Sequence, residues 1–169
     1  LADASHITLL GGGYIGLELA SAIRELDTEV CILELEDRIL KRVTTAEVSD
    51  FYHQYHANHG VDIRCSTGLE EIVSENGVLS KLKLSDDTEL KTDALIVGIG
   101  AIPNVSLAEA LGIAHEGGIH VDEYCRTSDP LILAAGDCTN HQNKLFSDRM
   151  RLESVPNALA QAKVVSSSI

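Results

Sequence analysis

Apolar positions change from the strand period to the helix period within the first part of the chain. The apolar run 6–10 ends in a glycine-rich turn, after which Leu19, Ile23 and Leu26 recur at helical spacing. A second apolar run, 28–34, has the length and the β-branched content of a strand. This pattern predicts a strand, a tight turn, a helix and a second strand.

Stop and start signals then predict a second helix and a third strand. Asp27 and Gly60 are placed to close the two helices in the left-handed conformation, and Thr44 with Glu47 has the spacing of a capping box. The expected apolar face of the second helix consists of Val48, Phe51, Tyr52 and Tyr55. With a third strand over 61–65, the alternation of strands and helices requires a parallel sheet with right-handed crossovers.

The pattern changes after the third predicted strand. The Asn76-Gly77 pair between two alternating segments predicts a β-hairpin, and the turn at Asp86-Asp87 adds a further strand. The apolar run 93–100 is typical of a central strand that is covered on both faces. We therefore expect the α/β class: a Rossmann-like parallel sheet with helices on both faces and an antiparallel β-meander in place of one crossover helix.

The last third of the chain predicts fewer regular elements. We expect a short helix over 105–112, extended segments over 117–129 and 131–138, and a final helix from Val155 onward. The helical spacing of the final segment is carried by Ala158, Leu159, Ala162 and Val165. Because the sequence lacks an initial Met and stops within a helical pattern, we expect it to be a piece of a longer protein.

Charge and composition exclude several classes of protein. The formal net charge is -13, which disfavours binding to a phosphate backbone, so we expect no nucleic-acid partner. No apolar run approaches the roughly 20 residues that cross a bilayer, so we expect no membrane segment. The cysteines are too far apart for a zinc site or a disulfide scaffold, and we expect buried thiols in a reducing cytoplasm. They are Cys31, Cys65, Cys125 and Cys138.

Three histidines at equal spacing raise the question of a metal site. His53, His56 and His59 stand three residues apart. Over two such steps the position drifts by about 120° around a helix, so the three side chains do not share one ion easily. We expect a polar helix face and no metal site.

A glycine motif with a following acid predicts dinucleotide binding. Gly11, Gly13 and Gly16 form G-x-G-x-x-G where the first strand meets the first helix, and Ile15 lies in the same turn. The motif lets a diphosphate approach the backbone at the helix N-terminus. Glu34, at the end of the second strand, can accept hydrogen bonds from both hydroxyls of the adenosine ribose. The alternative is a tight strand–helix turn with a solvated acid.

Charges near the ribose position favour one coenzyme over the other. Glu34, Glu36 and Asp37 would repel the extra phosphate of NADPH, which predicts NADH. Arg38 and Arg42 oppose this tendency. One of the two arginines could stack on the adenine or pair with the diphosphate, or both could be solvated.

Five stretches are similar to the flavin-dependent ferredoxin reductases of the putidaredoxin reductase type: GGGYIGLELA, LELEDRILKRV, VGIGAIPN, RTSDPLILAAGDC and RLESVPNALAQA. In that family an NADH domain is inserted into a split FAD domain, and a C-terminal domain follows. The resemblance implies an NADH-binding domain over 1–123 and the returning segment of the FAD domain over 124–169. It implies electron transfer from NADH through FAD to a ferredoxin-type [2Fe-2S] protein that feeds a monooxygenase or dioxygenase.

The resemblance also implies roles for residues of the NADH half. Tyr14 resembles the aromatic residue that gates the flavin face, and Glu18 resembles the helix carboxylate near the carboxamide. Gly98 and Gly100 would permit the close approach of the nicotinamide. Without the resemblance, the residues themselves favour a surface aromatic at Tyr14 and a partly buried helix acid at Glu18. A plain strand-to-loop turn is equally compatible with Gly98 and Gly100.

In the FAD half, Asp137 matches the acid that binds the FAD ribitol. Glu153 and Val155 match the segment beside the isoalloxazine and the nicotinamide, although some relatives carry Trp at the position of Val155. The absence of C-x-x-C disfavours a thioredoxin reductase. A related NADH oxidase, nitrite reductase or disulfide reductase, or a nucleotide-binding module without turnover, remains open. We expect this chain on its own to be inactive, since the first FAD half and the C-terminal domain are missing.

Overall fold

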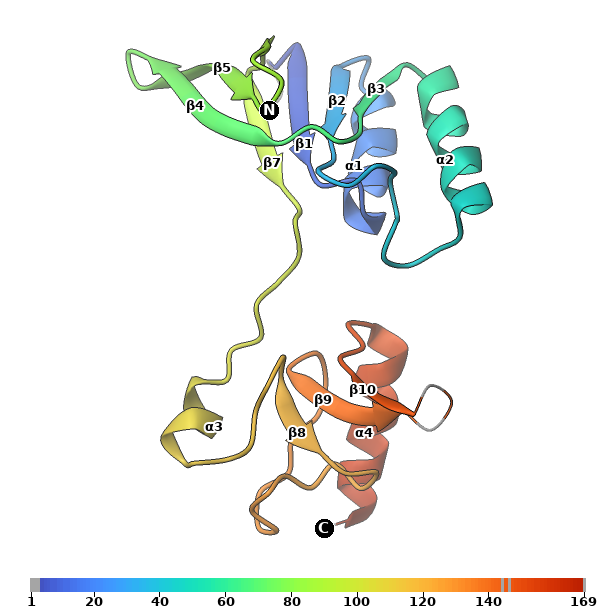
Figure 1. Ribbon diagram of the computed structural model, residues 1–169, viewed down its shortest axis with the longest axis vertical. Coiled ribbons are helices and arrows are strands. Elements are labelled where there is room, and N and C mark those ends of the chain that lie inside the picture. Colours follow the sequence, from blue (N-terminus) through green and yellow to red (C-terminus); the bar gives the residue numbers. More distant parts are fainter. Residues whose placement is uncertain (1–3, 144, 146, 169) are drawn as a thin grey trace. The chain divides into compact units, whose positions relative to one another are not determined.

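The computed structural model describes residues 4–143, 145 and 147–168, which belong to two compact units, Leu1–Gly100 and Ala101–Ile169 (Figure 1). The first unit contains β1 (His6–Leu10), α1 (Tyr14–Arg24), β2 (Glu29–Leu33), α2 (Ala46–Asn58), β3 (Val61–Arg64), β4 (Leu69–Glu75), β5 (Val78–Leu84), β6 (Glu89–Lys91) and β7 (Ala94–Val97). The second contains α3 (Ser106–Ala110), β8 (Ile119–Val121), β9 (Thr139–Asn143), β10 (Asp148–Met150) and α4 (Val155–Ser168). The functional boundary after residue 123 stays a prediction.

A four-stranded parallel sheet in the order β3-β2-β1-β7 organises the first unit. Ile7 lies opposite Val30, and Val30 lies opposite Val61, so these side chains share one face of the sheet. The steps from β1 to β2 and from β2 to β3 run in the same direction. Right-handed crossovers therefore place α1 and α2 on the same face, beside one another in Figure 1.

Two apolar cores lie on opposite faces of this sheet. The core under the helices joins Leu9 and Ile32 of the sheet to Leu17 of α1. The other core joins Leu33 of the sheet to Leu82 of the meander. The α/β class, the parallel sheet and the meander are confirmed, but three antiparallel strands, β4-β5-β6, cover the second face in place of a helix.

The strand β7 lies at the edge of the parallel sheet, where we expected a central strand. In the described residues it pairs only with β1, and Val97 is 58% exposed. Its apolar sequence has another cause, because Leu95 packs against the meander core and Ile96 against the helix core. Both faces of β7 are thus apolar although one edge is unpaired.

The helix α2 turns its aromatic residues outward, so its expected apolar face is wrong. Phe51 is 62% exposed, whereas Ser49 and His56 are buried. The Ser49 hydroxyl donates a hydrogen bond of 2.6 Å to the carbonyl of Ile39, which ties this face to the preceding loop. The predicted capping box is also wrong, since Thr45 is the N-cap and no side chain caps this end in the described structure.

Local turn signals are confirmed. Asp27 and Gly60 have φ values of 56° and 82° after α1 and α2, and Asn76 and Gly77 have 52° and 80° in the β4–β5 hairpin. Leu26, however, is 76% exposed, because the helix α1 has already ended at Arg24.

The second unit contains a small sheet in the order β10-β9-β8. The short helix α3 and the long helix α4 are confirmed, while the β9–β10 pair has no counterpart among the predicted elements. Segment 131–138 forms one isolated bridge, Leu133 with Arg126, instead of a strand. In α4 the buried residue is Gln161, and Leu159 is 58% exposed. Within the described part of the chain, no helix is both long and apolar enough to span a membrane.

Candidate functional site: the glycine turn at the sheet edge

Three strand ends are joined at the carboxyl edge of the parallel sheet. The Gly11 N–H donates to the carbonyl of Leu33 at 2.8 Å, and the Gly98 N–H donates to the carbonyl of Leu10 at 2.8 Å. The ends of β2, β1 and β7 are thereby aligned around the glycine turn. In open α/β sheets this edge is the usual place for a ligand.

The three glycines of the motif have different structural duties. Gly11 has a φ of 113°, and a Cβ there would lie 2.5 Å from the carbonyl oxygen of Gly98. A Cβ on Gly16 would lie 2.1 Å from the carbonyl oxygen of Gly11, so the helix can meet the strand only through a glycine. Gly13 differs, because its Cβ would meet no atom within 4 Å. The space above Gly13 is therefore open to a ligand.

The amino end of α1 faces this open space with unsatisfied amides. Gly13 is the N-cap and no side chain caps the helix here. The first intrahelical bond of this end runs from the Leu17 N–H to the carbonyl of Gly13, at 3.1 Å. The N–H groups of Tyr14 and Ile15 precede it and have no partner in the helix. Together with the helix dipole they suit a diphosphate.

The Glu34 carboxylate is held in place by two backbone amides. Oε2 accepts a hydrogen bond of 2.7 Å from the Gly12 N–H, and Oε1 accepts one of 2.9 Å from the Glu36 N–H. A carboxylate has about four acceptor positions in all, so each oxygen keeps one for another donor. Glu34 is therefore fixed beside the glycine turn and can still accept two hydroxyl groups.

Gly12 is a site residue that the sequence reasoning missed. A Cβ there would lie 2.7 Å from Cγ2 of Ile39 and 3.0 Å from Oε2 of Glu34. The Leu40 N–H also donates to the carbonyl of Gly12, at 2.9 Å. The signal was present as the second of three consecutive glycines, but the motif itself leaves that position open.

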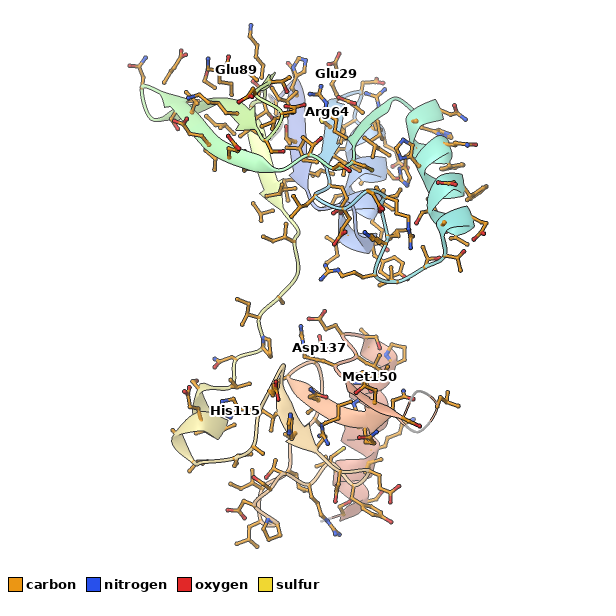
Figure 2. The ribbon with its side chains drawn as sticks, in the orientation of Figure 1. Glu29, Arg64, Glu89, His115, Asp137 and Met150 are labelled. Carbon is orange, nitrogen blue, oxygen red and sulfur yellow. The ribbon has the colours of Figure 1, made fainter. Side chains whose placement is uncertain are left out.

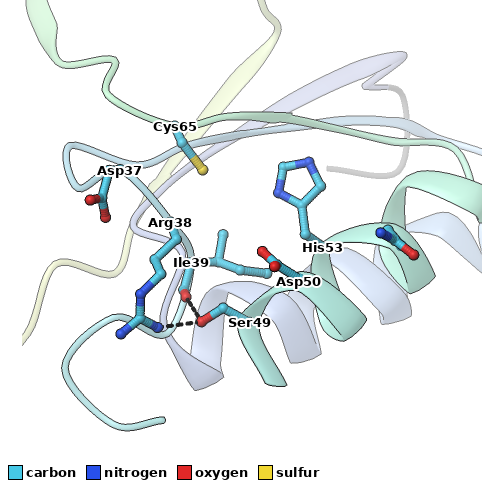
Figure 3. Close-up of a pocket in the computed structure, with 8 residues that line it drawn as sticks. Asp37, Arg38, Ile39, Ser49, Asp50, His53 and Cys65 are labelled. Atoms are coloured by element: carbon cyan, nitrogen blue, oxygen red, sulfur yellow. Dashed lines mark hydrogen bonds between the residues drawn. The ribbon is translucent and has the colours of Figure 1, made fainter. Parts of the chain in front are cut away.

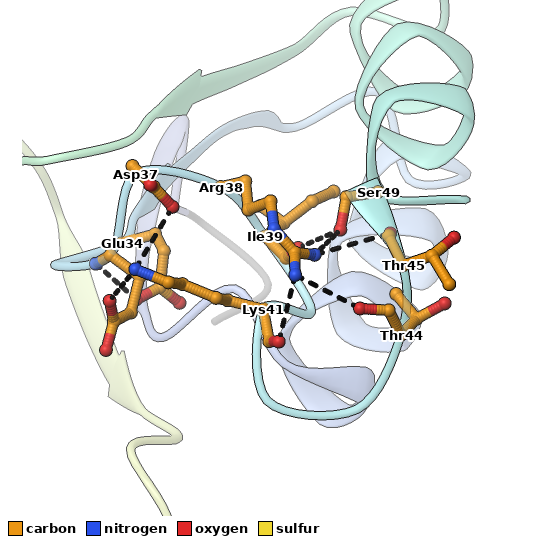
Figure 4. Close-up of polar contacts among 9 residues, drawn as sticks. Glu34, Asp37, Arg38, Ile39, Lys41, Thr44, Thr45 and Ser49 are labelled. Carbon is orange, nitrogen blue, oxygen red and sulfur yellow. Dashed lines mark hydrogen bonds and ion pairs between the residues drawn. The ribbon is translucent and has the colours of Figure 1, made fainter. Parts of the chain in front are cut away.

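The acids that follow Glu34 are paired with a lysine (Figure 4). Lys41 Nζ lies 2.8 Å from Glu36 Oε2 and 3.3 Å from Asp37 Oδ1. The hydrogen bond to Glu36 is the main reason why the pKa of Lys41 is raised. Glu36 and Asp37 are thus partly neutralised, and Glu34 is the acid that retains acceptor positions at the turn.

The two arginines of this loop have separate environments. Arg38 donates through Nη1 to Ser49 Oγ at 2.5 Å, and through Nη2 to the carbonyls of Lys41 and Thr44 at 3.1 Å (Figure 4). Arg38 is therefore a scaffold of the loop that leads into α2. Arg42 is exposed, and within the described structure no hydrogen bond or ion pair holds it. Of the two arginines, Arg42 is the one free to meet a ligand.

A separate cavity of about 280 Å³ lies between this loop and α2 (Figure 3). Arg38, Asp50, His53 and Cys65 are among the residues that line it. Burial raises the pKa of the Cys65 thiol, which disfavours its reactive thiolate form. Among the described residues no group of three or more His, Cys, Asp or Glu side chains is arranged to hold a metal ion.

The remaining predicted residues of the first unit lie at or near the glycine turn. Tyr14 is 60% exposed and Ile15 65% exposed at the start of α1. Glu18 is also exposed and stands one helical turn after Tyr14, so the two share a face of the helix. Gly100 has a φ of 106°, and a Cβ there would meet no atom within 4 Å.

The second unit holds the predicted flavin residues. Asp137, marked in Figure 2, is exposed in a turn that is closed by a 3.0 Å hydrogen bond from the Thr139 N–H to the carbonyl of Gly136. Arg151 pairs with Glu153 and lies 3.5 Å from the carbonyl oxygen of Asp137. The structure therefore links Asp137 and Glu153 through Arg151. Val155 is 72% exposed at the start of α4.

The four cysteines are free thiols. Cys31 and Cys125 are buried as expected, whereas Cys65 and Cys138 are half-buried. Burial raises the pKa of Cys31 to about 12, so this thiol stays protonated at neutral pH. In the described structure no two of these cysteines form a disulfide.

Comparison with known proteins agrees with this geometry. Residues 1–162 match the family model for pyridine nucleotide-disulphide oxidoreductase. A putidaredoxin reductase of Pseudomonas putida is 43% identical over 95% of this chain and 39% of its own length. The ferredoxin reductase of the CYP199A2 system from Rhodopseudomonas palustris is 39% identical with a TM-score of 0.95, over 98% of this chain and 41% of that one.

The complex of a putidaredoxin reductase with putidaredoxin is a further structural match. It has a TM-score of 0.94 and 40% identity, over 99% of this chain and 40% of the matched chain. The present chain thus spans about two fifths of the length of these relatives. The family match nevertheless covers nearly the whole chain. The chain belongs to the pyridine nucleotide-disulphide oxidoreductase family.

Proposed function

We propose that this chain is the NADH-binding part of a flavoprotein that passes electrons from NADH through FAD to a ferredoxin-type iron–sulfur protein. The observation that carries the proposal is the glycine turn, where open space above Gly13, the free amides of α1 and the fixed Glu34 carboxylate occur together. When bound, NADH would supply a hydride, and FAD would convert this two-electron donation into single-electron transfer.

The residues present at the turn fit a dinucleotide. Gly13 leaves room for the diphosphate, and the N–H groups of Tyr14 and Ile15 would donate to it. Glu34 would accept hydrogen bonds from both ribose hydroxyls through the acceptor positions that its backbone bonds leave free. Exposed Arg42 would meet the diphosphate or the adenine.

The same geometry supports NADH over NADPH. A 2′-phosphate at the ribose would meet the carboxylate of Glu34, whose position is fixed by two amides. Lys41 is already paired with Glu36 and Asp37, so it does not offset the charge of Glu34 at this point. Repulsion between the phosphate and this fixed carboxylate selects the coenzyme that lacks the phosphate.

The proposed roles on the flavin side belong to the second unit. Asp137 would bind the ribitol of FAD, and Glu153 would lie beside the isoalloxazine, with its carboxylate oriented by Arg151. Val155 would contact the ring segment through a smaller side chain than Trp. In the first unit, Tyr14 would gate the flavin face and Glu18 would lie near the carboxamide of the nicotinamide. Alignment of this kind is what a protein contributes when the cofactors carry the chemistry.

The proposed acceptor follows from the relatives. The solved complex pairs a putidaredoxin reductase with putidaredoxin, at 40% identity to this chain. A [2Fe-2S] protein that serves a monooxygenase or dioxygenase is the corresponding partner here. Since this chain carries a formal net charge of -13, its average field would repel an acidic partner. Arg149 and Arg151 would not offset this repulsion, because Arg149 donates to the carbonyls of Val121 and Asn140 and Arg151 is paired with Glu153.

The test is an anaerobic titration of the full-length gene product. The protein is purified, its FAD content is measured, and NADH or NADPH is added while the flavin absorbance is recorded. The proposal predicts bleaching of the flavin by NADH, much slower bleaching by NADPH, and reoxidation on addition of an oxidised [2Fe-2S] ferredoxin. A purified protein without flavin, or one whose flavin is reoxidised only by oxygen or a disulfide, would contradict it.

A further inference from the structure

The turn that carries Asp137 is tied to α4 by one buried side chain, Gln161. Gln161 is 8% exposed although it lies in the middle of a helix whose other side chains are mostly half-buried or exposed. Its Oε1 accepts a hydrogen bond of 2.7 Å from the Gly136 N–H and lies 3.0 Å from Oγ1 of Thr139. Burial of an amide costs more free energy than burial of an apolar side chain unless the amide is hydrogen-bonded. We therefore attribute the burial of Gln161 to its hydrogen bonds.

The orientation of the Gln161 amide follows from its partners. The Gly136 N–H can only donate, so the atom that faces it must be the carbonyl oxygen of the side chain. The hydroxyl of Thr139, which is 0% exposed, has a single proton placed between the Gly136 carbonyl at 2.8 Å and the Gln161 oxygen at 3.0 Å. Both ends of the turn 136–139 therefore meet one side-chain oxygen.

The backbone of the turn depends on this contact. Gly136 has a φ of 90°, and a Cβ there would lie 4.0 Å from Cβ of Ala158, so α4 lies directly against the turn. Arg151 reaches the carbonyl of Asp137 at a distance of 3.5 Å, which is a weak bond. The strong fixation of the turn thus comes from Gln161, while the side chain of Asp137 stays exposed.

We propose that Gln161 is a positioning residue for flavin binding, which fixes the turn 136–139 so that Asp137 is held where the FAD chain meets it. The inference rests on the proposed role of Asp137 toward FAD. Removal of the Gln161 oxygen leaves the Gly136 N–H and the Thr139 hydroxyl without their shared acceptor. The backbone of the turn then becomes more flexible. Because FAD binding must order Asp137, the affinity for FAD falls.

The test compares side chains of similar size at two positions of α4. In the full-length gene product, freed of flavin and titrated with FAD, Gln161→Met should raise the Kd for FAD about tenfold. Gln161→Glu keeps an acceptor oxygen and should stay within about threefold of the wild type. Lys163→Met introduces the same side chain at an exposed position two residues away and should leave the Kd unchanged.

A double-mutant cycle with Asp137→Ala separates positioning from general damage. If Gln161 acts through Asp137, Gln161→Met should change the Kd less than about twofold once Asp137 is absent. The positioning role is overturned if Gln161→Met raises the Kd for FAD equally in both backgrounds. It is also overturned if Gln161→Met binds FAD like the wild type while Asp137→Ala binds it more weakly. Neither result contradicts the proposed role of Asp137 itself. Full FAD affinity of Asp137→Ala instead contradicts the proposed function of that residue.

A milder variant covers the case in which Gln161→Met does not fold. Thr139→Val deletes only the hydroxyl donor and should raise the Kd for FAD about threefold. In the Asp137→Ala background this effect should disappear. If Thr139→Val binds FAD as tightly as the wild type, or weakens it equally in both backgrounds, the positioning role is overturned.

Discussion

The substitution Gly13→Ala distinguishes an effect on ligand binding from an effect on folding, because the added methyl group would fill space at the site without a clash in the fold. Gly13 has φ -83° and ψ -173°, an extended conformation that any residue adopts, and its Cβ would meet no atom within 4 Å. Gly13→Ala should therefore fold. At Gly16 the same methyl group would lie 2.1 Å from the carbonyl oxygen of Gly11, so Gly16→Ala must displace backbone.

The expected magnitudes follow from these distances. Alanine in place of glycine at the N-cap lowers the free energy of unfolding by up to about 1 kcal/mol. Alanine also reduces the conformational entropy of the unfolded chain, which raises the free energy of unfolding by a similar amount. The free energy of unfolding of Gly13→Ala should thus stay within about 1 kcal/mol of the wild type. Gly16→Ala should lose about 2 to 3 kcal/mol through overpacking.

The affinity for NADH should respond in a different way. The new methyl group of Gly13→Ala occupies the approach to the Tyr14 and Ile15 amides, so at least one charge-assisted hydrogen bond to the diphosphate is lost. Such a bond contributes about 1.5 to 3 kcal/mol, which corresponds to a Kd for NADH roughly 10- to 150-fold higher. Calorimetric titration with NADH and urea unfolding measure the two quantities. A folded Gly13→Ala variant with wild-type affinity for NADH would refute the reasoning.

Three further predictions concern residues around the turn and in α2. Glu34→Gln keeps only one acceptor oxygen for two backbone donors, so it should lower the free energy of unfolding by about 1 to 2 kcal/mol. Because the variant also lacks the negative charge, titration with both coenzymes should show a smaller preference for NADH over NADPH. An unchanged preference would contradict the role of the charge. Arg38→Met should lower the free energy of unfolding, measured with urea, by about 1 to 3 kcal/mol, because the Arg38 guanidinium donates four hydrogen bonds. Its matched control, Arg42→Met, should unfold like the wild type and weaken NADH binding, and the reverse outcome would reject the assignment of the two arginines. Burial lowers the pKa of His56 below 6.5, so the unfolded chain binds more protons on acidification and the free energy of unfolding should fall as the pH drops below about 6.5. His56→Asn should flatten this part of the pH profile, and an unchanged slope would count against burial as its cause.

Local signals in the sequence predicted the parts of the fold that depend on near neighbours. The glycine turn, the left-handed Asp27 and the Asn76-Gly77 hairpin are set by backbone geometry within a few residues, and all three are confirmed. The position of Glu34 at the turn follows from the strand that precedes it. Its bond to the Gly12 amide was not predictable, because the motif does not constrain the second glycine.

Which helix residues are buried depends on partners far away in the sequence, and periodicity did not predict it. The buried face of α2 contains Ser49 because Arg38 and the Ile39 carbonyl supply polar partners from the preceding loop. The buried residue of α4 is Gln161 because the turn around Gly136 needs an acceptor. In both helices a polar residue with a fixed partner is buried, while apolar neighbours remain exposed.

The order of strands in the sheet is a second property that the local pattern does not contain. The apolar sequence of β7 is compatible with a central or an edge position, since both require two apolar faces when a meander and a helix cover the sheet. Pairing with β1 alone places it at the edge.

The central claim is that NADH binds over the glycine turn, and a crystal structure of the protein with bound NADH tests it most directly. The account predicts a diphosphate within hydrogen-bond distance of the Tyr14 and Ile15 amides and both adenosine ribose hydroxyls on the carboxylate of Glu34. NADH bound elsewhere, such as in the cavity lined by Asp50 and His53, with no ligand at Gly13, would contradict it.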